Sequence, residues 1–221
     1  MGSRPSVCVS LVDEDLEVIG KAAPLADLFE VRIDLIGEKW REVVEQLKKP
    51  WLACNRSKDE GGKWVGSEPA RVDELFRAVG LGAKIIDVEL ASPDLARIVK
   101  TIKGRAECLI SYHNNKDTPP LEKLRGIIGK QLAAGADICK VVTTARAFED
   151  NIAVLQLIRD FPRARIVAFA MGEAGRISRV LCPLAGGYFT YASAAAGKES
   201  AAGQVTALEL SKIYRIMGYG E

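Results

Sequence analysis

Two side chains in this sequence could carry out covalent and acid-base chemistry together. Lys140 lies within the apolar run at residues 137–142, and His113, the only histidine among 221 residues, ends an earlier apolar run. A lysine amine that is buried near arginines and a histidine is expected to have a lowered pKa, which makes it a nucleophile near neutral pH. A histidine exchanges protons in the same pH range. The pair therefore indicates a nucleophile with an acid-base partner.

Further ionisable residues alternate with hydrophobic residues in strand-like runs. Glu30 and Arg32 do so in FEVRID, Asp87 and Glu89 in IDVEL, and Ser111 precedes the histidine in ISYH. In a barrel strand alternate side chains face the lumen, so these groups are expected inside, toward the carboxyl ends of their strands. An unpaired buried ion costs several kcal/mol, as an order of magnitude. This arrangement favours an active site, and a structural network of ion pairs is the alternative.

Eight short β-branched runs must position these side chains, and each is followed by an amphipathic stretch with helical spacing. The runs span residues 6–12, 29–35, 51–55, 84–90, 107–113, 137–142, 165–171 and 188–193. No linker rich in Pro, Gly or Ser divides the chain, and no GxGxxG motif for a dinucleotide occurs. The pattern predicts the α/β class, with residues 1–221 forming a single-domain (β/α)₈ TIM barrel.

Composition narrows the partners of this chain. The net charge is only +2 and no block of like charge occurs, which argues against binding to nucleic acid or to an anionic membrane surface. No stretch is apolar enough to span a bilayer, and acidic residues at positions 13–15 interrupt any signal peptide. The five cysteines are widely spaced and are expected to be reduced. We therefore expect a cytoplasmic protein that binds a small molecule.

Several motifs resemble type I 3-dehydroquinate dehydratase, and the resemblance extends along nearly the whole chain. Lys140 in GADICKVV resembles the family's Schiff-base lysine, and His113 in SYHNNKDTP resembles its general acid-base histidine. Arg56 and Glu60 in RSKDEGG resemble a substrate-contacting arginine and the glutamate that orients the histidine. The resemblance also puts Asp87 near the histidine. Lys140, His113 and Glu60 are thus the catalytic residues that the family implies.

The remaining family positions imply substrate binding. Glu30 and Arg32 resemble the family's Glu-x-Arg pair, and Arg179 in MGEAGRISR resembles the arginine that grips the substrate carboxylate. The same set contains Arg56 and, as contacts from the first strand and from ESAAGQVT, Ser10, Ser200 and Gln204. The implied reaction converts 3-dehydroquinate to 3-dehydroshikimate, the third step of the shikimate pathway in aromatic amino acid biosynthesis. The family needs no metal or organic cofactor, and its members are often homodimers.

Two other functions remain open on the residues alone. A class I aldolase also uses a lysine on the sixth barrel strand, but it cleaves a carbon-carbon bond. A non-catalytic barrel that binds a hydroxylated acid would form no imine at all. The segment 194–204 is rich in small residues and is predicted to be a lid that orders on substrate, with an ordinary flexible loop as its alternative.

Overall fold

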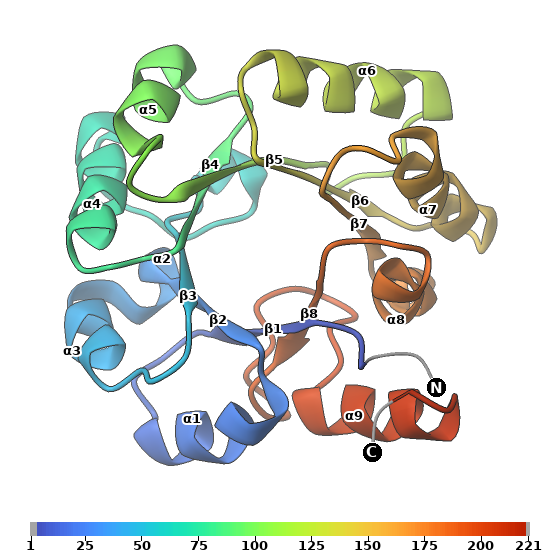
Figure 1. Cartoon of the computed structure of the whole chain (residues 1–221), viewed down its shortest axis with the longest axis horizontal. Helices are drawn as coiled ribbons and strands as arrows, with labels where there is room; N and C mark the ends of the chain where they lie inside the picture. Colours follow the sequence, from blue (N-terminus) through green and yellow to red (C-terminus); the bar gives the residue numbers. More distant parts are fainter. Residues whose placement is uncertain (1–3, 220–221) are drawn as a thin grey trace.

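The structure is a computed structural model that describes residues 4–219, in which eight parallel strands form a ring (Figure 1). The strands are β1 Val7–Leu11, β2 Leu28–Arg32, β3 Trp51–Cys54, β4 Ile85–Glu89, β5 Glu107–His113, β6 Ile138–Thr144, β7 Ile166–Met171 and β8 Thr190–Ser193. The predicted (β/α)₈ barrel is confirmed. The two ends of the predicted domain, residues 1–3 and 220–221, lie outside the described residues.

Helices follow the strands and surround the ring in Figure 1. They are α1 Leu16–Ala22, α2 Ile33–Ile36, α3 Trp40–Glu45, α4 Glu68–Gly80, α5 Leu95–Ile102, α6 Leu121–Ala133, α7 Glu149–Asp160, α8 Arg176–Leu184 and α9 Ala207–Ile216. Local signals fix several of their starts: Ser67 caps α4, and Thr206 and Glu209 form a capping box on α9. Within residues 4–219, no helix has the length and hydropathy that a membrane span requires.

The ring is nearly closed. Neighbouring strands pair in the order β7-β6-β5-β4-β3-β2-β1-β8, and the described residues show no ladder between β7 and β8. A hydrogen bond of 2.8 Å from the Tyr188 amide to the Ile166 carbonyl joins the starts of these two strands. Above it, Tyr191 of β8 packs edge-on against Phe169 of β7, with ring centroids 5.9 Å apart. Aromatic packing therefore replaces backbone pairing at this seam.

Alternation along each strand separates the helix layer from the lumen as predicted. Phe29, Val31 and Ile33 belong to the hydrophobic cluster under the helices, whereas Glu30 and Arg32 line a cavity in the lumen. Cys139 of β6 faces the helix layer, where it packs with residues of α6 and α7. The five cysteines are buried and unbridged in the described structure, and their reduced state stays a prediction.

The second strand is shorter than predicted. The run at residues 29–35 was expected to be one strand, but β2 ends at Arg32 and α2 begins at Ile33. Asp34, in the first turn of α2, accepts hydrogen bonds from the amides of Arg56 (3.2 Å) and Lys63 (3.0 Å). These long-range contacts stabilise the early turn, and they are invisible in the local hydrophobic pattern.

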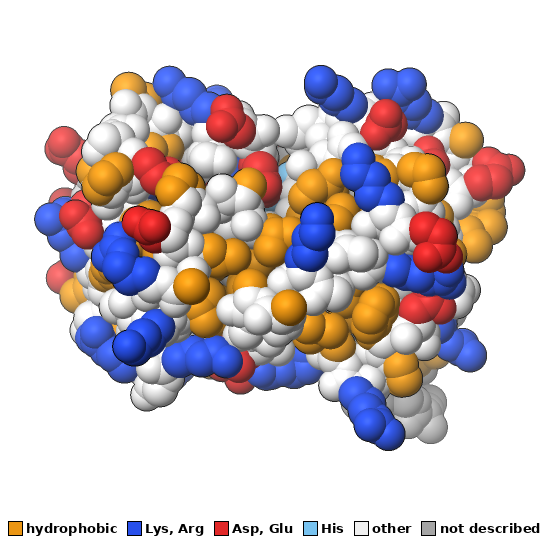
Figure 2. All heavy atoms as spheres, turned by 90° about the horizontal axis from the view of Figure 1, so that it is seen from above, with side chains coloured by type: hydrophobic (Ala, Val, Ile, Leu, Met, Phe, Trp, Pro, Cys, Tyr) orange, Lys and Arg blue, Asp and Glu red, His pale blue; other side chains and the backbone are white. Residues whose placement is uncertain are grey.

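Positive and negative side chains are mixed on the face shown in Figure 2. Lys and Arg side chains lie interspersed with Asp and Glu there, and no large area carries a single charge. The absence of a nucleic-acid partner stays a prediction from composition.

Two isoleucines on adjacent helices provide a matched test of this core. Ile128 of α6 is fully buried, whereas Ile152 of α7 is 57% exposed. We expect Ile128→Ala to lower the free energy of unfolding by about 2–5 kcal/mol, because it leaves a cavity in the core. Ile152→Ala should change it by less than about 0.5 kcal/mol. Urea unfolding followed by circular dichroism measures both, and equal losses would contradict this assignment of the core.

Candidate active site

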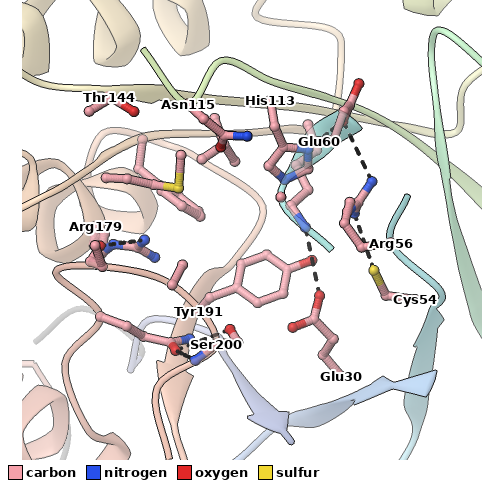
Figure 3. Close-up of a pocket in the computed structure, with 18 of the residues that line it drawn as sticks. Glu30, Cys54, Arg56, Glu60, His113, Asn115, Thr144, Arg179, Tyr191 and Ser200 are labelled. Carbon is pink, nitrogen blue, oxygen red and sulfur yellow. Dashed lines mark hydrogen bonds and ion pairs between the residues drawn. The ribbon is translucent and has the colours of Figure 1, made fainter. Parts of the chain in front are cut away.

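A cavity of about 350 Å³ opens where the strands end, and Figure 3 shows the side chains that point into it. The predicted site residues that line it are Glu30, Arg32, Arg56, Glu60, His113, Lys140, Arg179, Ser200 and Gln204. Of the predicted catalytic and substrate-binding residues, Ser10 is the one that does not line it. Asp87, Glu89 and Ser111, which were expected inside the barrel, are buried behind the cavity lining. Residues from β2 to the segment after β8 are thus gathered around one space that is large enough for a small organic molecule.

Lys140 lies in the middle of β6, is 4% exposed, and forms ion pairs with two carboxylates. Its Nζ is 2.9 Å from Asp87 Oδ2 and 3.7 Å from Glu30 Oε1. The sequence predicted arginines and a histidine as its neighbours, but the nearest charged groups are acidic. The nitrogen attacks a carbonyl carbon through its lone pair, which is free only in the neutral amine.

Asp87 also binds a second buried cation. Its Oδ2 lies 2.6 Å from Arg56 Nη2, and its Oδ1 accepts a hydrogen bond of 2.6 Å from Ser111 Oγ. Burial acts to raise the pKa of Asp87, but the charges of Arg56 and Lys140 outweigh it and hold this pKa well below its usual range. Asp87 therefore stays ionised between the two cations.

Glu60 contacts the histidine as predicted. Its Oε2 is 2.7 Å from His113 Nδ1. Burial lowers the pKa of His113 well below its ordinary value, and the nearby charges of Arg56 and Lys140 add to this effect. Burial likewise raises the pKa of Glu60 to about 8. A neutral imidazole is favoured, and because no other hydrogen bond to this ring occurs in the described part of the chain, Nε2 remains free to exchange a proton with a ligand.

The turn after β3 brings Glu60 to this position. It contains a short 3₁₀ helix at Lys58–Glu60 that ends at Gly61, which has a φ of +85°. Gly62 then lies so close to the chain that an added Cβ would be 2.0 Å from the Arg56 carbonyl oxygen. The two glycines are therefore needed for a tight turn, because a side chain at Gly62 would push Glu60 and Arg56 apart.

Arg179 is a buried cation without a carboxylate partner among the described residues. It is 1% exposed on α8, its Nη2 makes a long hydrogen bond of 3.4 Å to the Ala202 carbonyl, and its Nε has no partner there. The guanidinium carbon lies 4.4 Å from the centre of the Phe169 ring. Burial lowers its pKa to about 10, so the group stays charged at neutral pH. Such a site favours a ligand carboxylate.

A chain of hydrogen bonds connects the segment after β8 to the strands. Gln204 Oε1 accepts from the Ser200 amide (2.7 Å) and hydroxyl (3.1 Å), and Gln204 Nε2 donates to Ser10 Oγ at 3.2 Å. Ser10 in turn donates to Glu30 Oε2 at 2.7 Å. Ser10 thus lies behind Glu30 and orients it. Of the segment 194–204, Ser200, Ala201, Ala202 and Gln204 line the cavity, and ordering of the segment by substrate stays a prediction.

Arg32 is largely engaged within the protein. Its Nε and Nη2 bind the two oxygens of Asp34 at 2.9 and 2.8 Å, which leaves Nη1 for a ligand. Burial lowers the pKa of Arg32, but the hydrogen bonds and charge of Asp34 outweigh it and raise the net value. Asp34 therefore fixes the direction of this guanidinium.

Sequence reasoning missed several residues at this site. Tyr191, Asn115 and Thr144 line the cavity, and the ring centre of Tyr191 is 4.3 Å from Lys140 Nζ. Strand alternation could have found Tyr191, since it comes two residues after the inward-facing Phe189. The buried pair between Arg71 of α4 and Glu89 (2.7 Å) was also missed, because Arg71 lies in an amphipathic helix, where a charged residue is expected on the exposed face.

Three potential metal ligands approach one another in the cavity. Oxygen or sulfur atoms of Glu30, Cys54 and Asp87 lie within 4.8 Å of each other. Burial raises the pKa of the Cys54 thiol, so the sulfur stays protonated and binds a metal poorly. Asp87 is already paired with Lys140 and Arg56. The chemistry of this donor set therefore fits a divalent cation poorly.

The Glu60 pKa predicts a loss of stability as the pH rises from about 6.5 to 8. The folded chain keeps the Glu60 proton up to about pH 8, whereas the unfolded chain loses it near 4.5. In this window folding therefore takes up a proton, and the free energy of unfolding falls by about 1.4 kcal/mol per pH unit at most. The lowered pKa of His113 acts in the opposite direction, but only below its unfolded value of 6.5.

Urea unfolding of the parent and of Glu60→Gln at several values between pH 6.5 and 8 measures this slope. Glu60→Gln should show a flatter dependence, because the amide does not titrate. Glu122→Gln, at an exposed position of α6, is the control for loss of one charge and should keep the parent slope. The same slope in the parent and in Glu60→Gln would contradict the prediction.

Comparison with known proteins places the chain in a family. The family model described as type I 3-dehydroquinase matches residues 6–221. A 3-dehydroquinate dehydratase of Dehalococcoides mccartyi is 43% identical over 97% of this chain and 96% of its own. One of Methanocaldococcus jannaschii is 35% identical over 96% and 98%. The crystal structure of 3-dehydroquinate dehydratase from Geobacillus kaustophilus superposes with a TM-score of 0.86 at 25% identity, covering 98% of this chain and 92% of that one. On these grounds, the chain belongs to the type I 3-dehydroquinase family.

Proposed function

We propose that this chain dehydrates 3-dehydroquinate to 3-dehydroshikimate through an imine on Lys140. The observation that carries the proposal is the shared cavity of Lys140 and His113, with the unpaired Arg179 cation on its wall. Membership in the family supports the substrate. The substrate, a cyclic β-hydroxy ketone with a carboxylate, supplies both an electrophile for the lysine and an anion for the arginine.

Substrate binding begins at Arg179 in this proposal. The planar guanidinium donates two parallel hydrogen bonds to the carboxylate, and it has no competing carboxylate in the described part of the chain. Because Arg179 holds the carboxylate in place, it sets the distance between the ketone and Lys140. The other predicted binding residues contact the ring hydroxyls and the rest of the carboxylate; they are Glu30, Arg32, Arg56, Ser200 and Gln204. Ser10 acts through Glu30.

Imine formation follows. Lys140 passes a proton to the imidazole of His113, and its nitrogen adds to the ketone carbon. His113 carries this proton and then the second nitrogen proton to the oxygen, so the resulting carbinolamine loses its oxygen as water and leaves the protonated imine. Asp87, 2.9 Å from Nζ, holds the nitrogen in place before attack. The protonated imine draws electrons from the neighbouring carbon, so the proton there becomes acidic enough to remove. This sink replaces any metal or organic cofactor in the proposed reaction.

His113 performs the elimination. Its neutral imidazole removes the proton from the carbon beside the imine, and it returns a proton to the hydroxyl that leaves on the next carbon. Glu60, 2.7 Å from Nδ1, positions the ring so that Nε2 faces the ligand. Hydrolysis of the imine then releases the enone product and restores Lys140. Over the whole reaction the substrate loses one water molecule, and the protein is unchanged.

A cytoplasmic location and assembly as a homodimer stay predictions from the sequence and the family resemblance. The proposed partner is a small molecule, in agreement with the cavity volume of about 350 Å³.

Borohydride trapping tests the imine directly. Incubation with 3-dehydroquinate and sodium borohydride should leave a permanent mass increment that peptide mapping assigns to Lys140. Lys140→Ala should lose both the increment and the rise in absorbance of the conjugated product, because the nucleophile is gone. Lys130→Ala, at an exposed position of α6, should keep both.

The other outcomes of this experiment identify the rival functions. An increment on Lys140 with cleavage of the ligand into two carbonyl fragments would indicate an aldolase. No increment in the parent would indicate a barrel that only binds its ligand, and it would refute the proposed mechanism.

Arg179→Met tests the carboxylate anchor. Loss of charged hydrogen bonds to the substrate should raise KM roughly ten- to a hundredfold and change kcat less. The free energy of unfolding should stay the same or rise, because an unpaired buried cation is removed. Arg163→Met, at an exposed position before β7, is the control and should leave KM unchanged. Steady-state kinetics and urea unfolding provide the two measurements, and an unaltered KM for Arg179→Met would exclude the anchor.

A further inference from the structure

Tyr191 lies in the active-site cavity beside the reacting lysine. It is 3% exposed on β8, and its ring centre is 4.3 Å from Lys140 Nζ. Phe169 and Phe189 pack against its edges at centroid distances of 5.9 and 5.4 Å, so the ring has little freedom to move. Figure 3 shows the hydroxyl end of Tyr191 directed to the side of the cavity where Glu30 lies.

The hydroxyl of Tyr191 has no hydrogen-bond partner among the described residues. A buried hydroxyl without a partner destabilises a protein, and a phenylalanine would fill the same aromatic seam without this penalty. Tyr214 of α9 shows the usual arrangement, because its buried hydroxyl donates to the Val180 carbonyl at 2.9 Å. Burial and the negative charge of Glu30 raise the pKa of Tyr191, so its hydroxyl remains a donor. A donor held this close to a reacting nitrogen fits an acceptor on the bound ligand.

We propose that Tyr191 is a further catalytic residue, whose hydroxyl donates a hydrogen bond to the oxygen of the carbinolamine on Lys140 and whose ring faces the imine cation that follows. This inference rests on the proposed function and deepens it, since it assigns the imine-forming half of the reaction a residue of its own. The carbinolamine oxygen is bonded to the carbon that Lys140 Nζ attacks, so it forms next to the nitrogen that Tyr191 already contacts.

The step balances without any proton from Tyr191. Lys140 first passes one proton to the neutral imidazole of His113. As the C–N bond forms, the carbonyl π electrons move to the oxygen, which takes this proton back from His113, and the nitrogen then passes its second proton to the imidazole. In the next step the C–O bond breaks, the oxygen takes that second proton from His113 and leaves as water, and the nitrogen lone pair forms the C=N bond. Negative charge gathers on the oxygen during the addition, where a hydrogen bond from Tyr191 stabilises it. The aromatic face then stabilises the positive nitrogen of the imine.

Tyr191→Phe isolates the hydroxyl, since it keeps the ring and the aromatic seam. We expect kcat to fall roughly two- to tenfold, the usual range for loss of one neutral hydrogen bond, with KM little changed. Exchange of the product's ketone oxygen with oxygen-18 water above the rate seen without enzyme proceeds through the carbinolamine, and it should slow by a similar factor. The variant should be at least as stable as the parent, because a buried unpaired hydroxyl is removed.

Tyr214→Phe is the matched control. It removes the hydroxyl that bonds to Val180, far from the lysine in the sequence and outside the cavity lining. This variant should lose stability and keep the parent kcat and oxygen exchange. The two substitutions are chemically identical, so opposite patterns in activity and stability separate a catalytic hydroxyl from a structural one.

Three results would overturn the inference. In the first, Tyr191→Phe has the same kcat and the same rate of oxygen exchange as the parent, and the parent still forms the borohydride adduct on Lys140. In that case the proposed function stands and only the role of Tyr191 fails. Another is a fall in kcat that is fully matched by a smaller fraction of folded, adduct-forming protein, which marks a structural role. A parent that forms no adduct and exchanges no ketone oxygen refutes the proposed function and this inference together.

Discussion

The carboxylate of Asp87 holds two buried cations in the barrel, and the geometry of the active site depends on it. Its Oδ2 lies 2.9 Å from Lys140 Nζ and 2.6 Å from Arg56 Nη2, and its side chain is fully buried. Without this carboxylate two positive groups would face each other away from water, at a cost of about 3–5 kcal/mol for a broken buried pair. The lysine that the proposed reaction uses is thus placed by a residue that performs no covalent step itself.

The ion pairs continue behind the cavity and join it to the scaffold. Arg56 Nη1 lies 3.0 Å from Glu89 Oε1, and Arg71 of α4 reaches Glu89 Oε2 at 2.7 Å. Glu89 also accepts a hydrogen bond of 3.0 Å from the Ser57 amide, at the start of the turn that carries Glu60. The orientation of the histidine therefore depends on charges that belong to β4, to α4 and to the turn after β3. A network with satisfied partners of this kind is rigid.

On the opposite side of the cavity, buried polar groups lack hydrogen-bond partners in the described part of the chain. Arg179 Nε and Tyr191 Oη are both buried in the cavity wall and have no such partner among the described residues. They lie on α8 and β8, next to the seam where β7 and β8 do not pair. One wall thus holds Lys140 and His113 with protein partners, and the other presents polar atoms that a ligand can satisfy. A ligand can therefore gain binding energy from the polar groups that lack partners, while the residues that react keep theirs.

The sequence by itself determined the barrel and the catalytic candidates, because strand alternation and motif spacing are local properties. Eight runs with helical stretches between them predicted the ring, and alternation put Glu30, Arg32 and His113 in the lumen. Only the tertiary structure decided which groups pair. The nearest partners of Lys140 come from strands that are distant in the chain, so no local pattern revealed that they are carboxylates. The early end of β2 and the Tyr191 hydroxyl without a partner could not be predicted for the same reason. Both depend on neighbours that only folding brings together.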